Sequence, residues 1–245
     1  MPFRLEIRPF PSSRNRVLRV CGSLGASLLF AVAGQTASAQ APPAPAVRFV
    51  VVLDAAHGGD DPGGRIQDGR GQAEKTFTLA LSVKLRSLLA ARGIQVVTTR
   101  ESDSTVDPIR RAEVANHANA AACLSLHASD SGSGVHLFVS SLAPAQPARF
   151  AAWKTAQAGW VTRSLSLAGV LNSAFLQAGM AVSLGRIALP AVDSMTCPAV
   201  AVEISPERGP DKKVTAGLDD PAYQTRVAQA LAAALLEWRT EDNQP

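Results

Sequence analysis

Three apolar segments of the sequence each end beside a residue that can bind a metal ion or move a proton. His57 follows RFVVVLD and two alanines, His127 ends AACLSLH, and Glu203 ends PAVAVE. A fourth such residue, Glu74, comes directly after the polar, glycine-bearing loop that His57 begins. Two imidazoles and one carboxylate, with a position left for water, make the ligand set of a catalytic zinc site. The residue types therefore permit zinc chemistry.

Each of these residues also has an ordinary structural explanation. A single histidine after a strand often only bonds to a loop, and the helix dipole favours an acid such as Glu74 at a helix N-terminus. Glu203 is harder to explain, because a carboxylate emerging from an apolar strand is costly without a cation, a proton or a catalytic task. The sequence contains no HExxH motif, which would have favoured a zinc site over these structural explanations. If zinc binds, we expect Gly58 and Gly59 to let the backbone turn sharply and to keep bulk away from the metal.

Apolar periodicity places these residues on an α/β fold. Continuous apolar runs bounded by turns predict buried strands, and recurrence at helical spacing predicts amphipathic helices. The expected strands are Arg48–Asp54, Ile94–Arg100, Ala121–His127, Gly134–Ser141 and Cys197–Ser205, and the expected helices are Glu74–Arg92, Pro108–Ala120, Val161–Ala178 and Pro221–Arg239, with Ala143–Trp160 irregular apart from one short helix at most. This alternation predicts a three-layer domain with a mainly parallel, mixed and twisted sheet and helices on both faces. The carboxyl ends of parallel strands share one edge, where such sheets bind ligands.

The first 39 residues are typical of a secretory signal peptide. Five arginines precede an uncharged run, Val20–Ala33, and the small residues ASA follow at Ala37–Ala39. We expect cleavage after Ala39 and export to the periplasm or beyond. Residues 40–47 are rich in Pro and Ala and predict an extended linker, and residues 48–240 are expected to form a single catalytic domain. The apolar run is too short for a membrane span, which needs roughly 20 residues.

Charge and composition argue against nucleic acid as a partner. The whole chain has 24 basic and 20 acidic residues. Removal of residues 1–39 takes away five arginines and Glu6, which leaves 19 of each sign. The remainder shows no basic patch or aromatic platform.

Two cysteines, Cys123 and Cys197, remain after the expected cleavage, and both lie in apolar, strand-like segments. An oxidising compartment permits a disulfide if those strands are neighbours, but we expect two buried free thiols. Neither cysteine has the CxxC spacing of a zinc site.

Several motifs, in order and spacing, resemble the zinc-dependent N-acetylmuramoyl-L-alanine amidases (type 3) of bacterial cell walls. They are LDAAHGGDDPGG, GQAEKTFTLAL, TTRESDSTVDPIRRAEVAN, CLSLHAS and CPAVAVEIS. The resemblance as a whole covers about Phe49 to Trp238. The resemblance implies that His57, Glu74 and His127 are zinc ligands and that Glu203 is the catalytic glutamate. It also implies hydrolysis of the amide that joins N-acetylmuramic acid to L-alanine in peptidoglycan, in cell-wall remodelling or daughter-cell separation.

Other polar residues on the family pattern are expected to be structural. Arg100, Asp103, Arg111 and Asn116 fall between the second strand and the following helix, where we expect them to form salt bridges or caps. His117 and His136 are also expected to be structural, although His136 could face the cleft.

The chain departs from the family pattern around the site, while the zinc ligands are intact. Family members usually have Pro-Gly before the first histidine, Asn after the second, and Gly-Phe and an Arg near the glutamate. The corresponding residues here are Ala55 and Ala56, Ser129, Ser205 and Pro206, and Asp193. These differences affect the peptide-binding wall and therefore the fine substrate preference.

Regulation is expected to be simple. Some family members carry a long inhibitory helix between the second histidine and the glutamate, which an activator protein releases. The stretch from His127 to Glu203 is too short for that helix in addition to the core elements, so we expect an unregulated site.

Two other functions fit the same residues. The protein could be a zinc peptidase or deacylase that acts on a different amide. It could also be a cell-wall binding module that has lost catalysis. The products formed from peptidoglycan distinguish these alternatives from the amidase.

Overall fold

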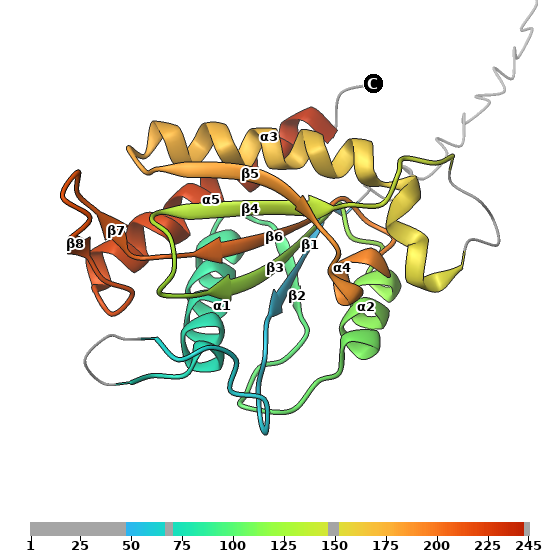
Figure 1. Cartoon of the computed structure of the whole chain (residues 1–245). Helices are drawn as coiled ribbons and strands as arrows, with labels where there is room; N and C mark the ends of the chain where they lie inside the picture. The colour runs from blue at the N-terminus through green and yellow to red at the C-terminus, as the bar shows by residue number, and fades with distance from the viewer. Residues whose placement is uncertain (1–47, 67–70, 147–151, 243–245) are drawn as a thin grey trace, which may run out of the picture. The chain divides into compact units, whose positions relative to one another are not determined.

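A mixed six-stranded sheet forms the centre of the fold (Figure 1). The computed structural model describes residues 48–66, 71–146 and 152–242. Across the sheet the strands follow the order β2-β1-β3-β6-β4-β5. Their bounds are β1 Val50–Ala55, β2 Gln95–Thr98, β3 Ala122–Ala128, β4 Val135–Ser140, β5 Val182–Ile187 and β6 Ala199–Ile204. The first four strands of this order are parallel, whereas β4 runs antiparallel to β6 and β5 runs parallel to β4.

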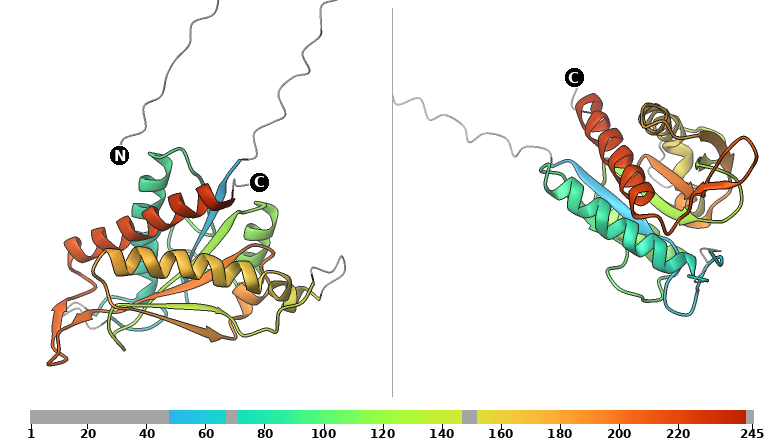
Figure 2. Two further views of the ribbon diagram at one scale, coloured as in Figure 1. Left: turned by 90° about the horizontal axis from the view of Figure 1, so that it is seen from above. Right: turned by 90° about the vertical axis from the view of Figure 1, so that its left-hand side faces the viewer.

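Helices cover both faces of the sheet, as the sequence predicts. One face carries α1 (Glu74–Ala90), α3 (Val161–Gln177) and α5 (Pro221–Asp242), and the other carries α2 (Pro108–His117), the 3-10 helix η1 (Trp153–Gly159) and α4 (Pro190–Asp193). Helices α3 and α5 lie side by side (Figure 2). The three-layer α/β architecture with a mainly parallel, mixed sheet is confirmed.

The alternation of side chains along the strands decides which face carries the polar residues. Val51 and Leu53 of β1 pack into the core below α1, α3 and α5, whereas Val52 packs toward α2 and α4. The same alternation puts Cys123 of β3 on the α2 and α4 face. His127 has the same parity as Cys123, so its side chain projects from that face too.

Helix α2 begins at a strong sequence signal. The Asp107 carboxylate accepts hydrogen bonds from the backbone N–H groups of Ile109 and Arg110, at 2.9 and 3.0 Å, and Pro108 occupies the first turn. This cap satisfies donors that would otherwise lack partners and fixes the start of the helix.

Four short elements were not expected from the sequence. They are β5, α4, and the hairpin of β7 (Glu207–Arg208) and β8 (Val214–Ala216). Strand β5 is a mostly exposed edge strand, so it lacks the apolar run by which the other strands are recognised. The segment Ala143–Trp160 contains one short helix, η1, in its described part.

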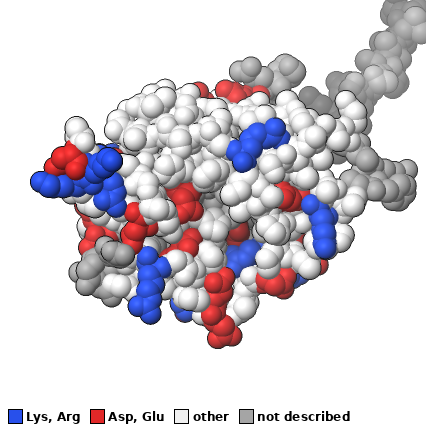
Figure 3. Space-filling view, viewed as in Figure 1, with Lys and Arg blue, Asp and Glu red and all other residues white. Residues whose placement is uncertain are grey.

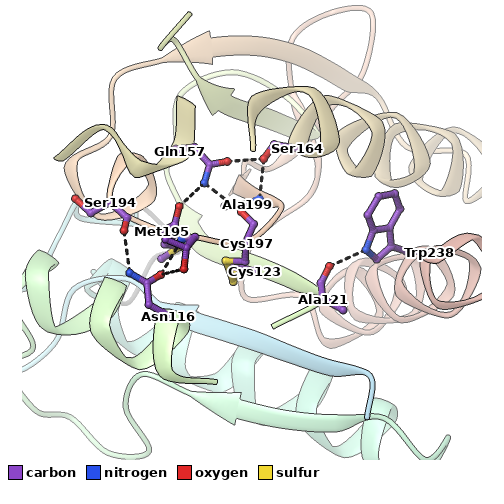
Figure 4. Close-up of a disulfide and its surroundings, with 11 residues drawn as sticks. Asn116, Ala121, Cys123, Gln157, Ser164, Ser194, Met195, Cys197, Ala199 and Trp238 are labelled. Atoms are coloured by element: carbon purple, nitrogen blue, oxygen red, sulfur yellow. Dashed lines mark hydrogen bonds between the residues drawn. A yellow bond between two sulfur atoms is a disulfide. The ribbon is translucent and has the colours of Figure 1, made fainter. Parts of the chain in front are cut away.

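The expectation of two free thiols is wrong, because Cys123 and Cys197 form a disulfide (Figure 4). Their strands are neighbours in the sheet, with Cys123 opposite Ala199 in the register of β3 and β6. The Cys123 N–H also donates to the Pro198 carbonyl at 2.8 Å, which holds the two segments together. The pairing depends on two strands 74 residues apart in sequence, and the local pattern does not show it.

The predicted signal peptide (residues 1–39) and the linker (40–47) lie outside the described residues. Within the described ranges, no helix combines the length and apolarity needed to cross a membrane.

Candidate metal centre

His57 lies directly after β1 in a backbone conformation that side-chain-bearing residues rarely adopt. Its φ is 61°, in the left-handed region, and Arg111 holds the strained residue by donating to its carbonyl oxygen at 2.7 Å. Its Nδ1 donates to Asp61 Oδ2 at 2.8 Å. That bond holds the pKa of Asp61 below its usual range. It also fixes the imidazole ring so that Nε2 is the nitrogen available to a metal.

Glu74, the first residue of α1, is buried and points both carboxylate oxygens at the two histidines. Oε2 lies 3.1 Å from His57 Nε2, and Oε1 lies 3.0 Å from His127 Nδ1. The backbone N–H groups of Gly64 and Ala128 donate to the same two oxygens, at 2.8 and 3.1 Å. Burial raises the pKa of Glu74, but the hydrogen bonds from His127, Gly64 and Ala128 outweigh it, so the pKa lies below its usual value. The side chain is therefore held as a carboxylate.

His127 occupies β3 one residue before the end of the strand. Burial lowers the pKa of its imidazole, but the hydrogen bond to Glu74 and the charges of Glu74 and Glu203 raise the pKa above its usual value. Its ring meets that of His57 edge to face, with centroids 5.4 Å apart.

The three side chains fit a divalent metal. One potential ligand atom from each of His57, Glu74 and His127 lies within 4.8 Å of the others. In a tetrahedral zinc site, bonds of about 2.0–2.2 Å put ligand atoms roughly 3.3–3.6 Å apart. The donors are also those that zinc prefers, two imidazole nitrogens and a carboxylate oxygen. Small side-chain adjustments would let all three bind one ion.

Glu203 lies beside this cluster on the neighbouring strand. In the parallel pairing of β3 and β6, Glu203 is the register partner of His127. Such partners project side by side from the same face. The half-buried Glu203 carboxylate is close enough to raise the pKa of His127. The structure thus brings together all four residues singled out from the sequence.

The glycine that keeps space for the ligands is Gly63, and not the pair first expected to do so. Gly63 has a φ of 66°, and a Cβ on it would lie 2.6 Å from both Glu74 Oε2 and His57 Cδ2. Gly58 and Gly59 do make the sharp turn, with φ of 132° and 59°. Their missing Cβ atoms, however, leave room for the backbone of Ser104 and Thr105 and not for the metal site. The expectation about bulk near the metal was therefore wrong for this pair.

A buried ion pair supports the turn that carries His57. Asp54, which is 1% exposed, accepts from Arg111 at 2.6 Å and from Thr99 and Ser125 at 2.7 Å each. Arg111 also donates to the carbonyl groups of Ala55 and His57, each at 2.7 Å. The carboxylate of Asp54 and the guanidinium of Arg111 are thus both paired with groups of the protein, which agrees with the structural role expected for Arg111.

The other residues of the family pattern also hold backbone segments in place. Arg100 donates to the carbonyl oxygens of Ala55 and Ala56, and Asp103 pairs with Lys75 at 2.7 Å. Asn116 neither caps a helix nor forms a salt bridge. It bonds instead to Ser194 and Thr196 beyond α4, which ties α2 to the segment leading into β6 (Figure 4).

The two remaining histidines lie outside the ligand cluster. His117 is the last residue of α2. His136, on β4, is the register partner of Glu203, and its Nδ1 lies 2.7 Å from Ser183 Oγ. Its Nε2 is buried and has no hydrogen-bond partner among the described residues. His136 therefore lies on the same face as the site, next to the glutamate.

Sequence reasoning missed Asp61 as part of the site. Its carboxylate orients His57, as carboxylates commonly orient histidine ligands of metals. Its position four residues after His57, in HGGDD, is a signal that could have identified it.

A cavity of about 190 Å³ opens beside the ligands on the α2 and α4 face. Its lining includes His57, Asp61 and His127 as well as Pro108 and Pro190, and we call it the metal cavity. In the space-filling view, charged side chains of both signs gather over the lower part of this face, while the surface over α3 and β5 is mostly uncharged (Figure 3).

Known proteins are similar to this chain in sequence and in fold. The family model described as N-acetylmuramoyl-L-alanine amidase matches residues 51–237. The chain is 36% identical over 84 residues to the sporulation-specific N-acetylmuramoyl-L-alanine amidase of Bacillus subtilis, covering 34% of this chain and 32% of that protein. It is 38% identical over 79 residues to the amidase AmiA of Escherichia coli, covering 32% and 27%. The chain thus aligns with about a third or less of these curated relatives.

A solved structure extends the comparison to the whole domain. The catalytic domain of CwlV, an N-acetylmuramoyl-L-alanine amidase from Bacillus (Paenibacillus) polymyxa var. colistinus, superposes with a TM-score of 0.61 at 27% identity, covering 78% of this chain and 98% of that domain. With the family model matching more than half of the sequence, the chain belongs to the N-acetylmuramoyl-L-alanine amidase family.

Proposed function

We propose that the protein is a zinc-dependent hydrolase that cuts the amide bond between N-acetylmuramic acid and L-alanine in peptidoglycan. The observation that carries this proposal is the convergence of His57, Glu74 and His127, from three separate elements, within 4.8 Å of one another and beside Glu203. Family membership supplies the substrate. The physiological role that fits is cell-wall remodelling or daughter-cell separation.

The residues divide the work of holding the metal. His57 through Nε2, His127 through Nδ1 and Glu74 through its oxygens would bind Zn²⁺, and Asp61 and Arg111 would keep His57 in place. When bound, zinc polarises the scissile carbonyl and makes water a better nucleophile near neutral pH. Three protein ligands leave one position open, as in catalytic zinc sites.

Glu203 would move the proton that the reaction requires. Amide hydrolysis takes a proton from the attacking water and delivers one to the departing amine nitrogen. Glu203 projects beside His127 from the adjacent strand, where a carboxylate can serve as base and then as acid.

We further propose that the protein acts outside the cytoplasm, on peptidoglycan, after removal of residues 1–39. The Cys123–Cys197 disulfide supports export, because disulfides persist in oxidising compartments. We also propose that the site works without an activator. In the described part of the segment between β4 and α3, the one helix is the short η1, which Gln157 anchors to Met195 and Cys197.

Muropeptide analysis tests the proposed activity. Purified peptidoglycan would be digested with the protein, with and without a chelator, and the new termini identified by mass spectrometry. We expect free L-alanine amino termini and lactyl carboxylates, lost with chelator and restored by zinc. Cleavage within the stem peptide would indicate a peptidase instead, and zinc binding without any product would indicate a binding module.

A further inference from the structure

A second cavity continues the metal cavity along the same face of the molecule. It has a volume of about 320 Å³ and shares Pro108 and Pro190 with the metal cavity. Its lining also includes Ile109, Trp153, Lys154 and Asp193. We call this cavity the aromatic trough. The elements that form it, α2, α4 and η1, lie together at one end of the face (Figure 1). A chain bound at the metal can therefore extend directly into the trough.

The lining of the aromatic trough combines apolar and polar side chains. Trp153 is 50% exposed and Ile109 is 49% exposed, although side chains of these types are usually buried. The Lys154 ammonium lies 5.2 Å from the centre of the Trp153 ring, which orients the indole. An exposed, oriented aromatic ring beside a catalytic cleft is typical of a binding surface.

The charges of the trough favour a neutral occupant. Lys154 and Asp193 contribute one charge of each sign. The Asp193 carboxylate is already engaged by Ser140 Oγ at 2.6 Å and by the Leu189 N–H at 3.2 Å. Arg111, in the adjoining metal cavity, is committed to Asp54. Among the described residues that line the trough, Lys154 is therefore the one cationic side chain that an acidic peptide would meet.

A different, more charged cavity is lined partly by residues that follow the site residues in sequence. It has a volume of about 500 Å³ and is lined by Asp130, Pro206 and Arg208, which follow His127 and Glu203 in sequence, and by Asp219. The substrate of the proposed reaction is asymmetric, because its glycan is uncharged and rich in N-acetyl groups while its stem peptide carries carboxylates. This cavity has two acidic residues against one arginine and so offers no net positive charge to those carboxylates, whereas the aromatic trough offers an exposed aromatic ring to the uncharged glycan.

We propose that the aromatic trough binds the glycan strand, with an N-acetylated amino sugar stacked on Trp153. The apolar face of a pyranose ring packs against an aromatic ring, and its hydroxyl and amide groups can bond to the polar side chains of the lining. This inference rests on the proposed function for the identity of the glycan. It adds the prediction that the protein prefers muramic acid within a chain of sugars to an isolated muramoyl peptide.

Binding of a peptide-free sugar tests the trough without catalysis. Tetra-N-acetylchitotetraose would be titrated into the purified full chain, with binding followed by calorimetry. We expect saturable binding that Trp153→Ala abolishes and that Ile109→Ala weakens. The control is Leu176→Ala, which removes an equally exposed apolar side chain, 58% exposed, from α3. Thermal denaturation would establish that every variant is folded, and unchanged binding by both trough variants would overturn the proposal.

Turnover of long and short substrates provides the second test. We expect Trp153→Ala to lower the ratio of kcat/KM on glycan strands bearing stem peptides to kcat/KM on a single muramoyl dipeptide by about 3- to 10-fold. Leu176→Ala should leave the ratio unchanged. An equal loss on both substrates, or competition for the trough by a free stem peptide, would contradict glycan binding. If the wild-type protein binds the sugar, Trp153→Ala abolishes that binding, and the wild type shows no amidase turnover, then the proposed function is refuted and the trough assignment stands.

Discussion

Hydrogen bonds hold both the side chain and the backbone of His57. Asp61 accepts from its imidazole ring, and Arg111 donates to its carbonyl oxygen. The positive φ of His57 makes this support necessary, because a left-handed conformation costs a non-glycine residue roughly 1–2 kcal/mol. The candidate site thus depends on side chains outside the proposed ligand set.

Asp61→Asn should weaken zinc binding without removing a ligand. An amide is a poorer acceptor for the His57 Nδ1–H and leaves the ring less firmly oriented, so we expect the zinc affinity to fall by roughly 10- to 100-fold. Competition with a chromophoric chelator measures this affinity. Asp60→Asn is the matched control, because Asp60 is exposed and next in sequence. Equal zinc affinity in wild type and Asp61→Asn would remove Asp61 from the site.

Substitutions at His127 and Glu203 should separate metal binding from turnover. His127→Ala removes one of three ligands, so bound zinc and activity should be lost together. Glu203→Gln keeps the shape of the side chain but cannot accept the proton, so zinc should stay bound while kcat falls by roughly 10²- to 10⁴-fold. Metal content and muropeptide release, measured on the same samples, distinguish the two effects. Full activity in Glu203→Gln would exclude it as the base.

At the scale of elements, the site depends on a loop that turns back against α1. Gly64 donates to Glu74 through its backbone, and Gly63 leaves the space into which Glu74 and His57 converge. Strand pairing positions the other two site residues, because the register of β3 and β6 places His127 beside Glu203.

Gly63→Ala and Gly71→Ala form a matched pair that tests this packing. Both glycines have nearly the same φ, 66° and 65°, so alanine causes similar backbone strain at either position. A Cβ at Gly63 would clash with two metal ligands, whereas at Gly71 no described atom lies within 4 Å. We expect Gly63→Ala to lose zinc affinity and turnover, and Gly71→Ala to lose only a little stability. Chelator competition and thermal denaturation measure the two effects, and similar zinc affinities would contradict the role of Gly63.

At the scale of the whole molecule, the disulfide joins β3 to the segment that enters β6. These two strands carry His127 and Glu203, and Gln157 and Asn116 bond to the backbone around Cys197 (Figure 4). The covalent link therefore lies on the same face of the sheet as the site, between the sheet and helices α2 and α4, and Cys123 precedes His127 along β3.

Reduction of the disulfide should destabilise the fold. Closing a loop across a separation of 74 residues restricts the unfolded chain, and for loops of this size the expected contribution is about 4 kcal/mol. Urea unfolding with and without reductant measures the difference in the free energy of unfolding. The Cys123→Ala/Cys197→Ala double variant should show no response to reductant. An unchanged midpoint for the reduced wild type would contradict a stabilising role for the bond.

Local sequence patterns predict most of the elements and single out the reactive residues. Apolar runs predicted β1, β3 and β6, because the apolar pattern of a buried strand is local in sequence. The motifs around His57, Glu74, His127 and Glu203 are also local, and they indicated the family. The edge strand β5 escaped notice because its exposed residues carry no such pattern.

Which of these residues meet depends on the folded chain. The Cys123–Cys197 bond, the support of His57 by Arg111, the place of Gly63 and the trough beside Trp153 all arise from contacts between segments brought together by folding. Asp61, four residues from His57, is a local partner. Such contacts depend on strand order and register, which non-local packing sets. A local sequence pattern fixes the side that a residue faces, but not the neighbour that it meets there.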